Sequence, residues 1–357
     1  MIRLENLRQK LDEYGVEGII TSHPANRRYL SRFTGSEGYI IVTAEQTIVA
    51  TDFRYIQQAK NEAPDYEIYQ IHGGINQWFT ELVGSLNIQT LGFEAEHTGY
   101  QTYQRFTEAI KQSGLSLNLK PTASIVEALR QVKDTEELAQ IKKAAALGDA
   151  AMNHLADWLK PGVTELEAVW EVEKYLRESG SEGVAFEIIV ASGQSAAMPH
   201  AQPSLKTILE GEPIIVDLGA CVNGYMSDLS RTLCLGTPDE QFKKIYNIVL
   251  GAELASIAII EEGMTGTAAD NIARRFIEET GFGNEFGHSL GHGVGLEVHE
   301  QPRLATGSKD ILSEGMVFTI EPGIYLPGWG GVRIEDLVTL ENGKIKILSA
   351  ARKVNND

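Results

Sequence analysis

The chain has 357 residues, 43% of them hydrophobic and 22% charged, which is the composition of a globular protein with a large core. At roughly 100–200 residues per domain, this length predicts two domains. The formal net charge of -18 argues against nucleic-acid binding, which requires a basic surface.

The N-terminal segment lacks the apolar stretch of a signal peptide, because Leu4, Leu7 and Leu11 alternate with charged residues at helical spacing. No apolar run approaches the roughly 18 residues of a membrane span. The two cysteines, Cys221 and Cys234, form neither a metal motif nor a disulfide framework and are interpreted as small core residues. We therefore expect a cytoplasmic protein that does not bind a membrane.

Helical and strand patterns alternate up to about residue 124, which predicts an α/β domain. An N-terminal helix is followed by strands at GVEGIITS, YIIVT and TIVATDFRY, a helix at QWFTELVGSL and a strand at IQTLGFEAE. Arg27, Arg28, Tyr29 and Phe33 fall in a block that is predicted to be a loop. This block either has a structural role or contributes to a pocket across a dimer.

Long amphipathic helices follow this first region. Asp134 with Glu137, and Thr164 with Glu167, have the spacing of a capping box at the start of two helices. Beyond about residue 186 the chain is predicted to form strands that carry polar residues, interrupted by two further helices. We place the two domains at residues 1–127 and 128–357.

Two aspartates flank a predicted hairpin in EGEPIIVDLGACVNGYMSDLSRTLCLG. An Asn-Gly turn at 223–224 sets a register in which Asp217 faces Ser230 and Asp228 faces Gly219. Asp217 and Asp228 then share one face as diagonal neighbours. Two carboxylates in an apolar hairpin repel each other and lose hydration unless cations lie between them. The alternative is that one aspartate is exposed and the other caps a turn.

Three of the eight histidines, His288, His292 and His299, lie close together in FGHSLGHGVGLEVHEQP. Imidazole is the commonest nitrogen ligand for metals and an acid or base near neutral pH. Gly291, Gly293 and Gly295 leave the backbone around His292 uncovered, so we expect a metal or substrate to approach there. One such histidine would more often be structural, but three together indicate a functional site.

Two glutamates lie in strand patterns nearer the C-terminus. Glu321 ends the apolar run MVFTI, and Glu335 lies inside VRIEDLVTL. Buried glutamates require a partner. Arg333 is two residues from Glu335 on the same strand face, so an ion pair between these two residues is the alternative to a metal site.

Together, Asp217, Asp228, His292, Glu321 and Glu335 offer four carboxylates and one imidazole. This donor set suits a hard or borderline divalent ion, for which we expect Mn²⁺, with Co²⁺ or Zn²⁺ as alternatives. Four carboxylates carry more charge than one divalent ion neutralises, which favours two ions. The histidines argue against a structural calcium site, since Ca²⁺ prefers oxygen ligands alone.

These segments resemble the pita-bread metallopeptidases, in the proline-directed branch of aminopeptidase P and prolidase. The matching blocks are VDLGACVNGYMSDLSRT, GHSLGHGVGLEVHE, FTIEPGIY and GVRIED, in the family's order. An N-terminal block, PANRRYLSRFTGSEGYIIVT followed by TDFRY, resembles the smaller domain of short bacterial Xaa-Pro peptidases. The resemblance covers nearly the whole chain. It implies an α+β protein, with a creatinase-like α/β N-terminal domain followed by a pita-bread metallopeptidase domain.

The resemblance also implies a role for each matching residue. Asp217 would bind one metal through both oxygens, Asp228 and Glu335 would bridge the two metals, and His292 and Glu321 would bind the second. The predicted catalytic residues are Glu321, His299, His288 and His200, and the predicted substrate-binding residues are His200, His288, His299, Arg333 and Tyr225. One departure from the family is Leu337, where many members carry a third acid, and it touches no ligand position.

The implied activity is hydrolysis of the Xaa-Pro bond at the N-terminus of peptides by a metal-bridging hydroxide, that is, an Xaa-Pro aminopeptidase. Glu321 would shuttle the proton and His299 would stabilise the oxyanion. One alternative is an Xaa-Pro dipeptidase (prolidase) restricted to dipeptides. Another is a non-catalytic peptide-binding module, against which the intact ligand set argues. The resemblance further implies a homodimer that takes proline-containing peptides.

Overall fold

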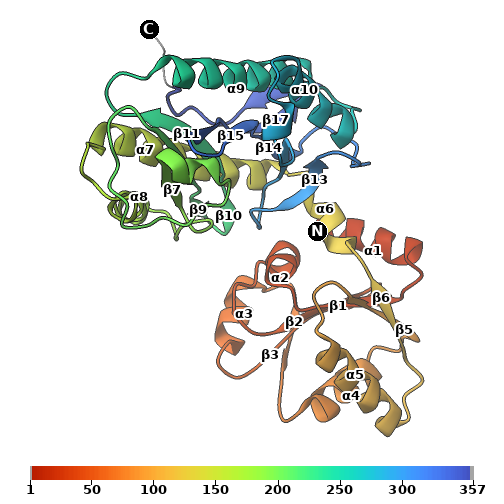
Figure 1. Ribbon diagram of the computed structural model, residues 1–357. Coiled ribbons are helices and arrows are strands. Elements are labelled where there is room, and N and C mark those ends of the chain that lie inside the picture. The colour runs from red at the N-terminus through yellow and green to blue at the C-terminus, as the bar shows by residue number, and fades with distance from the viewer. Residues whose placement is uncertain (1, 354–357) are drawn as a thin grey trace. The chain divides into compact units, whose positions relative to one another are not determined.

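The chain divides into two compact units, Met1–Arg130 and Gln131–Asp357, of which the computed structural model describes residues 2–353 (Figure 1). The division follows α6 (Ile125–Arg130), the short helix that contains the predicted boundary between residues 127 and 128. Within residues 2–353, no helix combines the length and the apolar character needed to cross a membrane.

The first unit is built on one mixed sheet with helices packed against it. Its elements are α1 (Ile2–Glu13), β1 (Gly18–Thr21), α2 (Pro24–Ser31), β2 (Tyr39–Thr43), β3 (Thr47–Thr51), α3 (Ile56–Glu62), β4 (Glu67–Gln70), α4 (Ile75–Gly84), β5 (Thr90–Glu94), α5 (Tyr100–Ser113), β6 (Asn118–Thr122) and α6. The strand order is β4-β3-β2-β1-β5-β6, with β2 antiparallel to both of its neighbours. Phe79 of α4 stacks on Phe106 of α5 in the core beside the sheet, with the ring centroids 4.1 Å apart.

The block that was predicted to be a loop contains helix α2, so this prediction is wrong for Pro24–Ser31. A proline at the first helical position favours the helix, because its φ is already helical and its missing N–H would have no partner there. Arg27 and Tyr29 are buried, and Arg27 donates to the carbonyls of Ser36 and Gly38. Buried polar side chains give this short helix no apolar periodicity to recognise.

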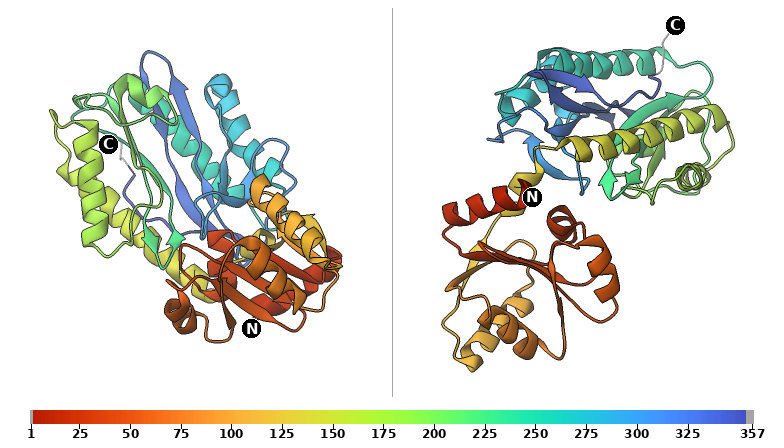
Figure 2. Two further views of the ribbon diagram at one scale, coloured as in Figure 1. Left: turned by 90° about the horizontal axis from the view of Figure 1, so that it is seen from below. Right: turned by 180° about the vertical axis from the view of Figure 1, so that it is seen from behind.

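The second unit consists of small sheets between two pairs of helices. Its elements are α7 (Thr135–Trp158), α8 (Glu165–Glu178), β7 (Ile189–Ser192), η1 (Gly193–Ala197), β8 (Pro213–Leu218), β9 (Cys221–Val222), β10 (Tyr225–Met226), β11 (Leu229–Cys234), α9 (Glu240–Ile259), α10 (Gly266–Glu279), η2 (Gly283–Glu285), β12 (Gly291–Gly293), β13 (Glu300–Leu304), β14 (Val317–Ile320), β15 (Gly323–Leu326), β16 (Gly330–Arg333), β17 (Asp336–Glu341) and β18 (Lys344–Ile347). The sheets are β11-β8-β7 and β13-β12-β14-β17-β18, with the hairpins β9-β10 and β15-β16. Figure 2 shows these strands between the α7–α8 pair and the α9–α10 pair.

Helices α7 and α8 begin where the sequence predicts. Asp134 and Thr164 each form a complete capping box, with Glu137 and Glu167 as their respective partners. These caps satisfy backbone N–H groups that otherwise lack a partner in the first turn of a helix. Both predicted capping boxes are therefore confirmed.

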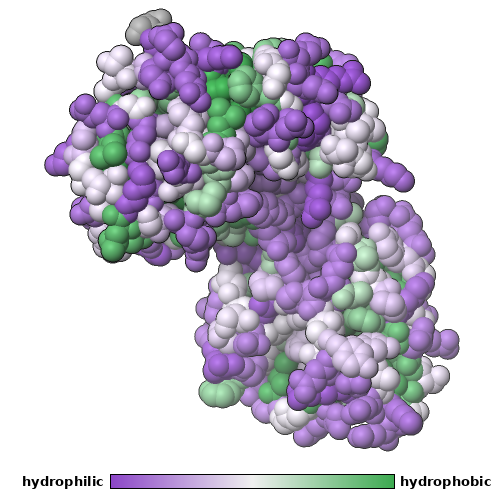
Figure 3. Space-filling model, in the orientation of Figure 1, coloured by the Kyte–Doolittle hydropathy of each residue, from purple (hydrophilic) through white to green (hydrophobic). Residues whose placement is uncertain are grey.

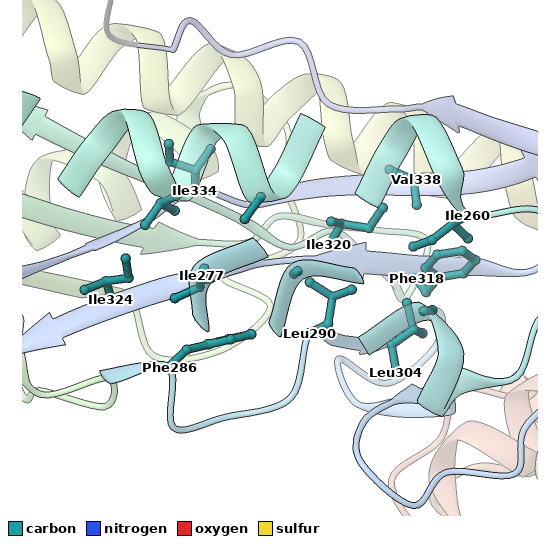
Figure 4. Close-up of a cluster of buried hydrophobic side chains, with 14 of the residues drawn as sticks. Ile260, Ile277, Phe286, Leu290, Leu304, Phe318, Ile320, Ile324, Ile334 and Val338 are labelled. Carbon is teal, nitrogen blue, oxygen red and sulfur yellow. The ribbon is translucent and has the colours of Figure 1, made fainter. Parts of the chain in front are cut away.

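The core of the second unit lies directly behind the predicted metal ligands. Figure 4 shows Leu290, Ile320 and Ile334 within a cluster of buried apolar side chains. Ile320 and Ile334 each precede a predicted ligand, Glu321 or Glu335, by one residue. Because side chains alternate between the two sides of an extended chain, burying the isoleucines turns the glutamates away from this core. On the face shown in Figure 3, hydrophobic residues occur in small scattered groups on each unit.

Candidate functional site

The aspartate hairpin has the register that the sequence predicts. Tyr225 pairs with Val222 in β9-β10, and Ser230 pairs with Asp217 in β11-β8. Asn223 and Gly224 have φ angles of 47° and 70°, as the turn between two twisted strands requires. The long hairpin therefore brings Asp217 and Asp228 to one face of the unit from opposite sides of the turn.

His292 and three carboxylates converge in front of this hairpin. Asp228, His292 and Glu335 each present one ligand atom, and these atoms lie within 4.8 Å of one another. The Nε2 atom of His292 lies 3.6 Å from Asp228 Oδ2 and 3.4 Å from Glu321 Oε1. His292 Nδ1 lies 3.1 Å from the Gly293 carbonyl, so Nδ1 donates its proton there. This leaves the Nε2 lone pair facing the acids, in the orientation that a metal-binding histidine needs.

The carboxylates of this cluster resist ionisation in the absence of a cation. Burial raises the pKa of Asp228 well above its ordinary value, and the charges of Glu335 and Asp217 raise it further. Burial also raises the pKa of Glu335, with Glu321 and Asp217 adding to the effect. The pKa of Glu321 is raised in the same direction, again chiefly by burial. Bound divalent ions would replace these protons and remove the repulsion.

Asp217 supplies a direct test of whether a metal fits. Its Oδ2 atom accepts from Arg333 Nη2 at 2.7 Å, whereas its Oδ1 atom is buried without a hydrogen-bond partner. Buried polar atoms almost always have a partner, so an unsatisfied carboxylate oxygen beside three further acids and an imidazole is suited to binding a cation. The residues present therefore suit the divalent metals that the sequence predicts. This conclusion holds for Mn²⁺, Co²⁺ and Zn²⁺ alike.

Arg333 pairs with Asp217 and not with Glu335, so the ion pair that was the alternative to a metal site at Glu335 does not form. The guanidinium is buried and also donates to Ser230 Oγ at 2.9 Å and Tyr325 Oη at 3.0 Å. A further bond reaches the carbonyl of Pro199. Four of the five N–H donors of Arg333 are thus engaged inside the protein.

The glycines around His292 serve a different purpose from the one predicted. A Cβ atom on Gly291 would lie 2.0 Å from the carbonyl oxygen of Thr319, and one on Gly293 would lie 2.2 Å from that of Gln301. The close neighbours are therefore backbone atoms of β14 and β13, and not a metal or substrate. These glycines allow β12 to fit between its two neighbours and hold His292 at the cluster.

The three other predicted histidines gather beside the acids. The ring of His299 lies 4.3 Å from that of His292, and the charge of His200 contributes to lowering the pKa of both His288 and His299. Burial is the main cause of both shifts, and it lowers the pKa of His288 to about 4. His288 donates from Nδ1 to the Ser289 carbonyl, so the Tyr325 hydroxyl donates to its Nε2 at 2.8 Å.

Tyr225, one of the predicted substrate-binding residues, contacts helix α7. Its side chain is buried, and its hydroxyl lies 3.1 Å from Glu137 Oε1 of α7. Glu137 is the same residue that completes the capping box with Asp134. This contact joins the hairpin to α7.

Several residues near the cluster were not predicted from the sequence. Thr319 accepts from the backbone N–H of His292 and donates to Glu321 Oε1, both at 3.1 Å. Tyr325 links Arg333 to His288 through its hydroxyl, because a buried tyrosine hydroxyl usually forms a hydrogen bond. Arg303 is exposed opposite His292 in the β12-β13 pair, and its charge contributes to lowering the pKa of His299. The position of Arg303 opposite His292 follows only from the pairing of β12 with β13.

The chain is similar to known peptidases over nearly its whole length. The uncharacterized peptidase YqhT of Bacillus subtilis (strain 168) is 40% identical over 354 residues, which cover 99% of each chain. A solved structure of an Xaa-Pro dipeptidase from Bacillus anthracis is 41% identical, with a TM-score of 0.95 over 99% of this chain and 98% of that chain. The X-Pro aminopeptidase from Thermotoga maritima MSB8 is 35% identical, with a TM-score of 0.90 over 99% of both chains.

Two protein-family profiles account for most of the sequence. The profile of Metallopeptidase family M24 matches residues 139–342, and that of the Creatinase/Prolidase N-terminal domain matches residues 3–132. The family and the fold class predicted from the sequence are both confirmed. The chain therefore belongs to metallopeptidase family M24, with a creatinase-type domain preceding its pita-bread metallopeptidase domain.

Proposed function

We propose that this protein is an Xaa-Pro aminopeptidase, which removes the N-terminal residue of peptides whose second residue is proline. The observation that carries the proposal is the convergence of Asp217, Asp228, His292, Glu321 and Glu335 at one site with histidines beside it. The similarity to the X-Pro aminopeptidase from Thermotoga maritima over 99% of both chains supports the proposed substrate class.

The five ligands would hold two divalent ions, with Asp217 on one, His292 and Glu321 on the other, and Asp228 and Glu335 between them. Mn²⁺ is the proposed metal, because carboxylate oxygens with a single imidazole suit a hard or borderline ion. Two bound ions would bring the pKa of a water molecule toward 7 and polarise the scissile carbonyl.

The remaining chemistry falls to the side chains. Glu321 would accept the proton of the attacking water and pass it to the leaving proline nitrogen. Its carboxylate is oriented for this by Thr319. His299, exposed next to His292, would donate to the developing oxyanion. His288 is held neutral by burial, so it would offer an uncharged side chain to the proline ring, and His200 would line the same pocket.

A strict Xaa-Pro dipeptidase is the second candidate, and Arg303 is the observation that favours it. An exposed arginine near His299 is available to bind the free carboxylate of a dipeptide, whereas Arg333 is engaged by protein atoms. The Bacillus anthracis structure that shares 41% identity is an Xaa-Pro dipeptidase. Both candidates use the same metals and the same proline pocket.

Hydrolysis of Ala-Pro and Ala-Pro-Ala, measured side by side with Mn²⁺-loaded protein, separates the two candidates. An aminopeptidase cleaves the tripeptide, whereas cleavage of Ala-Pro alone would assign the protein as a dipeptidase. The variant Glu321→Gln tests the proton transfer, and we expect it to be inactive while still folded. Near-normal turnover by this variant would contradict the role given to Glu321. A homodimer and a cytoplasmic location remain predictions from the resemblance and the composition.

A further inference from the structure

We propose that residues 349–353, which pack against α7 and α9, are a positioning element for the metal centre. This element acts on Glu335 through Arg231 and Asp336, and Lys353 is its essential contact. The inference rests on the proposed function in one respect, which is that Glu335 binds metal.

The backbone of Glu335 is held on both sides by β11. Its N–H donates to the carbonyl of Ser230 at 3.1 Å, and its own carbonyl accepts from Nη1 of Arg231. Glu335 lies between β16 and β17, where the chain passes from one small sheet to another, so no continuous strand fixes its direction. These two bonds, together with a hydrogen bond from the Ser230 side chain, hold Glu335 in the cluster.

Arg231 connects Glu335 to the C-terminal segment. Its guanidinium is 2% exposed and donates to Asp336 Oδ1 at 2.8 Å. It also donates from Nη2 to the carbonyl of Ala351 at 3.0 Å. The Arg231 guanidinium thus lies between the Asp336 carboxylate and the Ala351 carbonyl. Movement of either group would change how Arg231 binds the Glu335 carbonyl.

Lys353 neutralises part of the negative charge of two buried acids, Glu253 and Asp336. Its ammonium lies 2.8 Å from Glu253 Oε2 and 2.9 Å from Asp336 Oδ2. Glu253 is fully buried, and its Oε1 atom has no hydrogen-bond partner. Without Lys353, two buried carboxylates would compete for Arg231, and the attraction of a second acid would draw the guanidinium away from the Glu335 carbonyl.

The segment is fixed to α7 by a separate contact. The side chain of Asp149 accepts from the backbone N–H groups of Ala350 and Ala351, both at 2.8 Å. This contact sets the position of the Ala351 carbonyl that Arg231 binds. Residues 349–353 therefore join α7, α9 and β11, the strand that follows Asp228, at a point behind the ligands.

The test measures Mn²⁺ binding to metal-stripped full-length protein by calorimetry, at a temperature where circular dichroism shows every variant folded. We expect Lys353→Met to weaken Mn²⁺ binding at least about tenfold, as changes behind metal ligands do. Lys353→Arg should restore most of the affinity, because it keeps the charge. The matched control is Arg352→Met, which removes a neighbouring cation whose exposed side chain contacts Asn153 and Asp157 of α7, away from Arg231 and Asp336, and should leave the affinity within about twofold.

Wild-type Mn²⁺ affinity in Lys353→Met would overturn the proposal, even if the variant unfolds at a lower temperature, because the segment would then be only structural. If Lys353→Met does not fold, Asp149→Asn releases the same segment without changing Lys353, and unchanged affinity there would equally overturn the proposal. A wild-type protein that binds no Mn²⁺ would refute the metal centre itself, which separates that failure from a failure of the positioning element.

Discussion

Protonation of His288 gives the metal-free protein a predictable loss of stability in acid. Burial lowers the pKa of His288 in the folded protein to about 4. In the unfolded chain the pKa is about 6.5. Between these two values the unfolded state binds a proton that the folded state does not, so stability falls as the pH falls from 6.5 to 4. From pH 7 to pH 5 the expected loss from this residue is about 2 kcal/mol.

Urea unfolding of metal-stripped wild type and His288→Gln, followed by tryptophan fluorescence at pH 7 and pH 5, measures this loss. The wild-type free energy of unfolding should fall by about 2 kcal/mol more than that of the variant over this range. Other titrating groups change stability too, but they are common to both proteins and cancel in the difference. His72→Gln, which removes an exposed histidine from the first unit, is the control and should follow the wild type. Parallel pH dependences for wild type and His288→Gln would refute the reasoning.

Three further changes test other parts of the site. Gly291→Ala would press a methyl group against the Thr319 carbonyl, so we expect weaker Mn²⁺ binding in calorimetry, and wild-type binding would show that β12 can move aside. Arg333→Met leaves the largely buried Asp217 without its cation, so urea unfolding of the metal-free protein should show a loss of about 3–5 kcal/mol in the free energy of unfolding. A loss below about 1 kcal/mol would contradict the importance of the pair. Arg303→Met should lower kcat/KM for Ala-Pro more than for Ala-Pro-Ala amide, which has no free carboxylate, and equal effects on the two substrates would remove Arg303 from substrate binding.

The hairpin could be predicted from the sequence because its information is local. The Asn-Gly turn at 223–224 sets the register, and the register alone places Asp217 and Asp228 on one face. The capping boxes at Asp134 and Thr164 each involve only four consecutive residues, so they can also be recognised from the sequence. In these places local turn and cap chemistry agrees with the final fold, and the prediction succeeds.

The contacts that hold the site together depend on residues far apart in the chain. Arg333 is 116 residues from its partner Asp217, whereas the sequence offered only the nearer Glu335 as an alternative partner on one strand face. Arg231 reaches the carbonyl of Ala351, 120 residues away. A hydrophobic pattern carries no information about which buried charges meet across sheets. Such pairs become visible only when the strands are placed in three dimensions.

The most direct test of the central claim is a titration of metal-stripped protein with Mn²⁺, in which bound metal and Ala-Pro-Ala hydrolysis are measured on the same samples. Asp217, Asp228, His292, Glu321 and Glu335 are proposed to hold two ions that act together. We therefore predict that activity rises with bound Mn²⁺ and is complete at two ions per chain, and that Asp228→Asn reduces both. Full hydrolysis by protein that binds no metal, or two tightly bound ions with no cleavage of any Xaa-Pro peptide, would contradict the account.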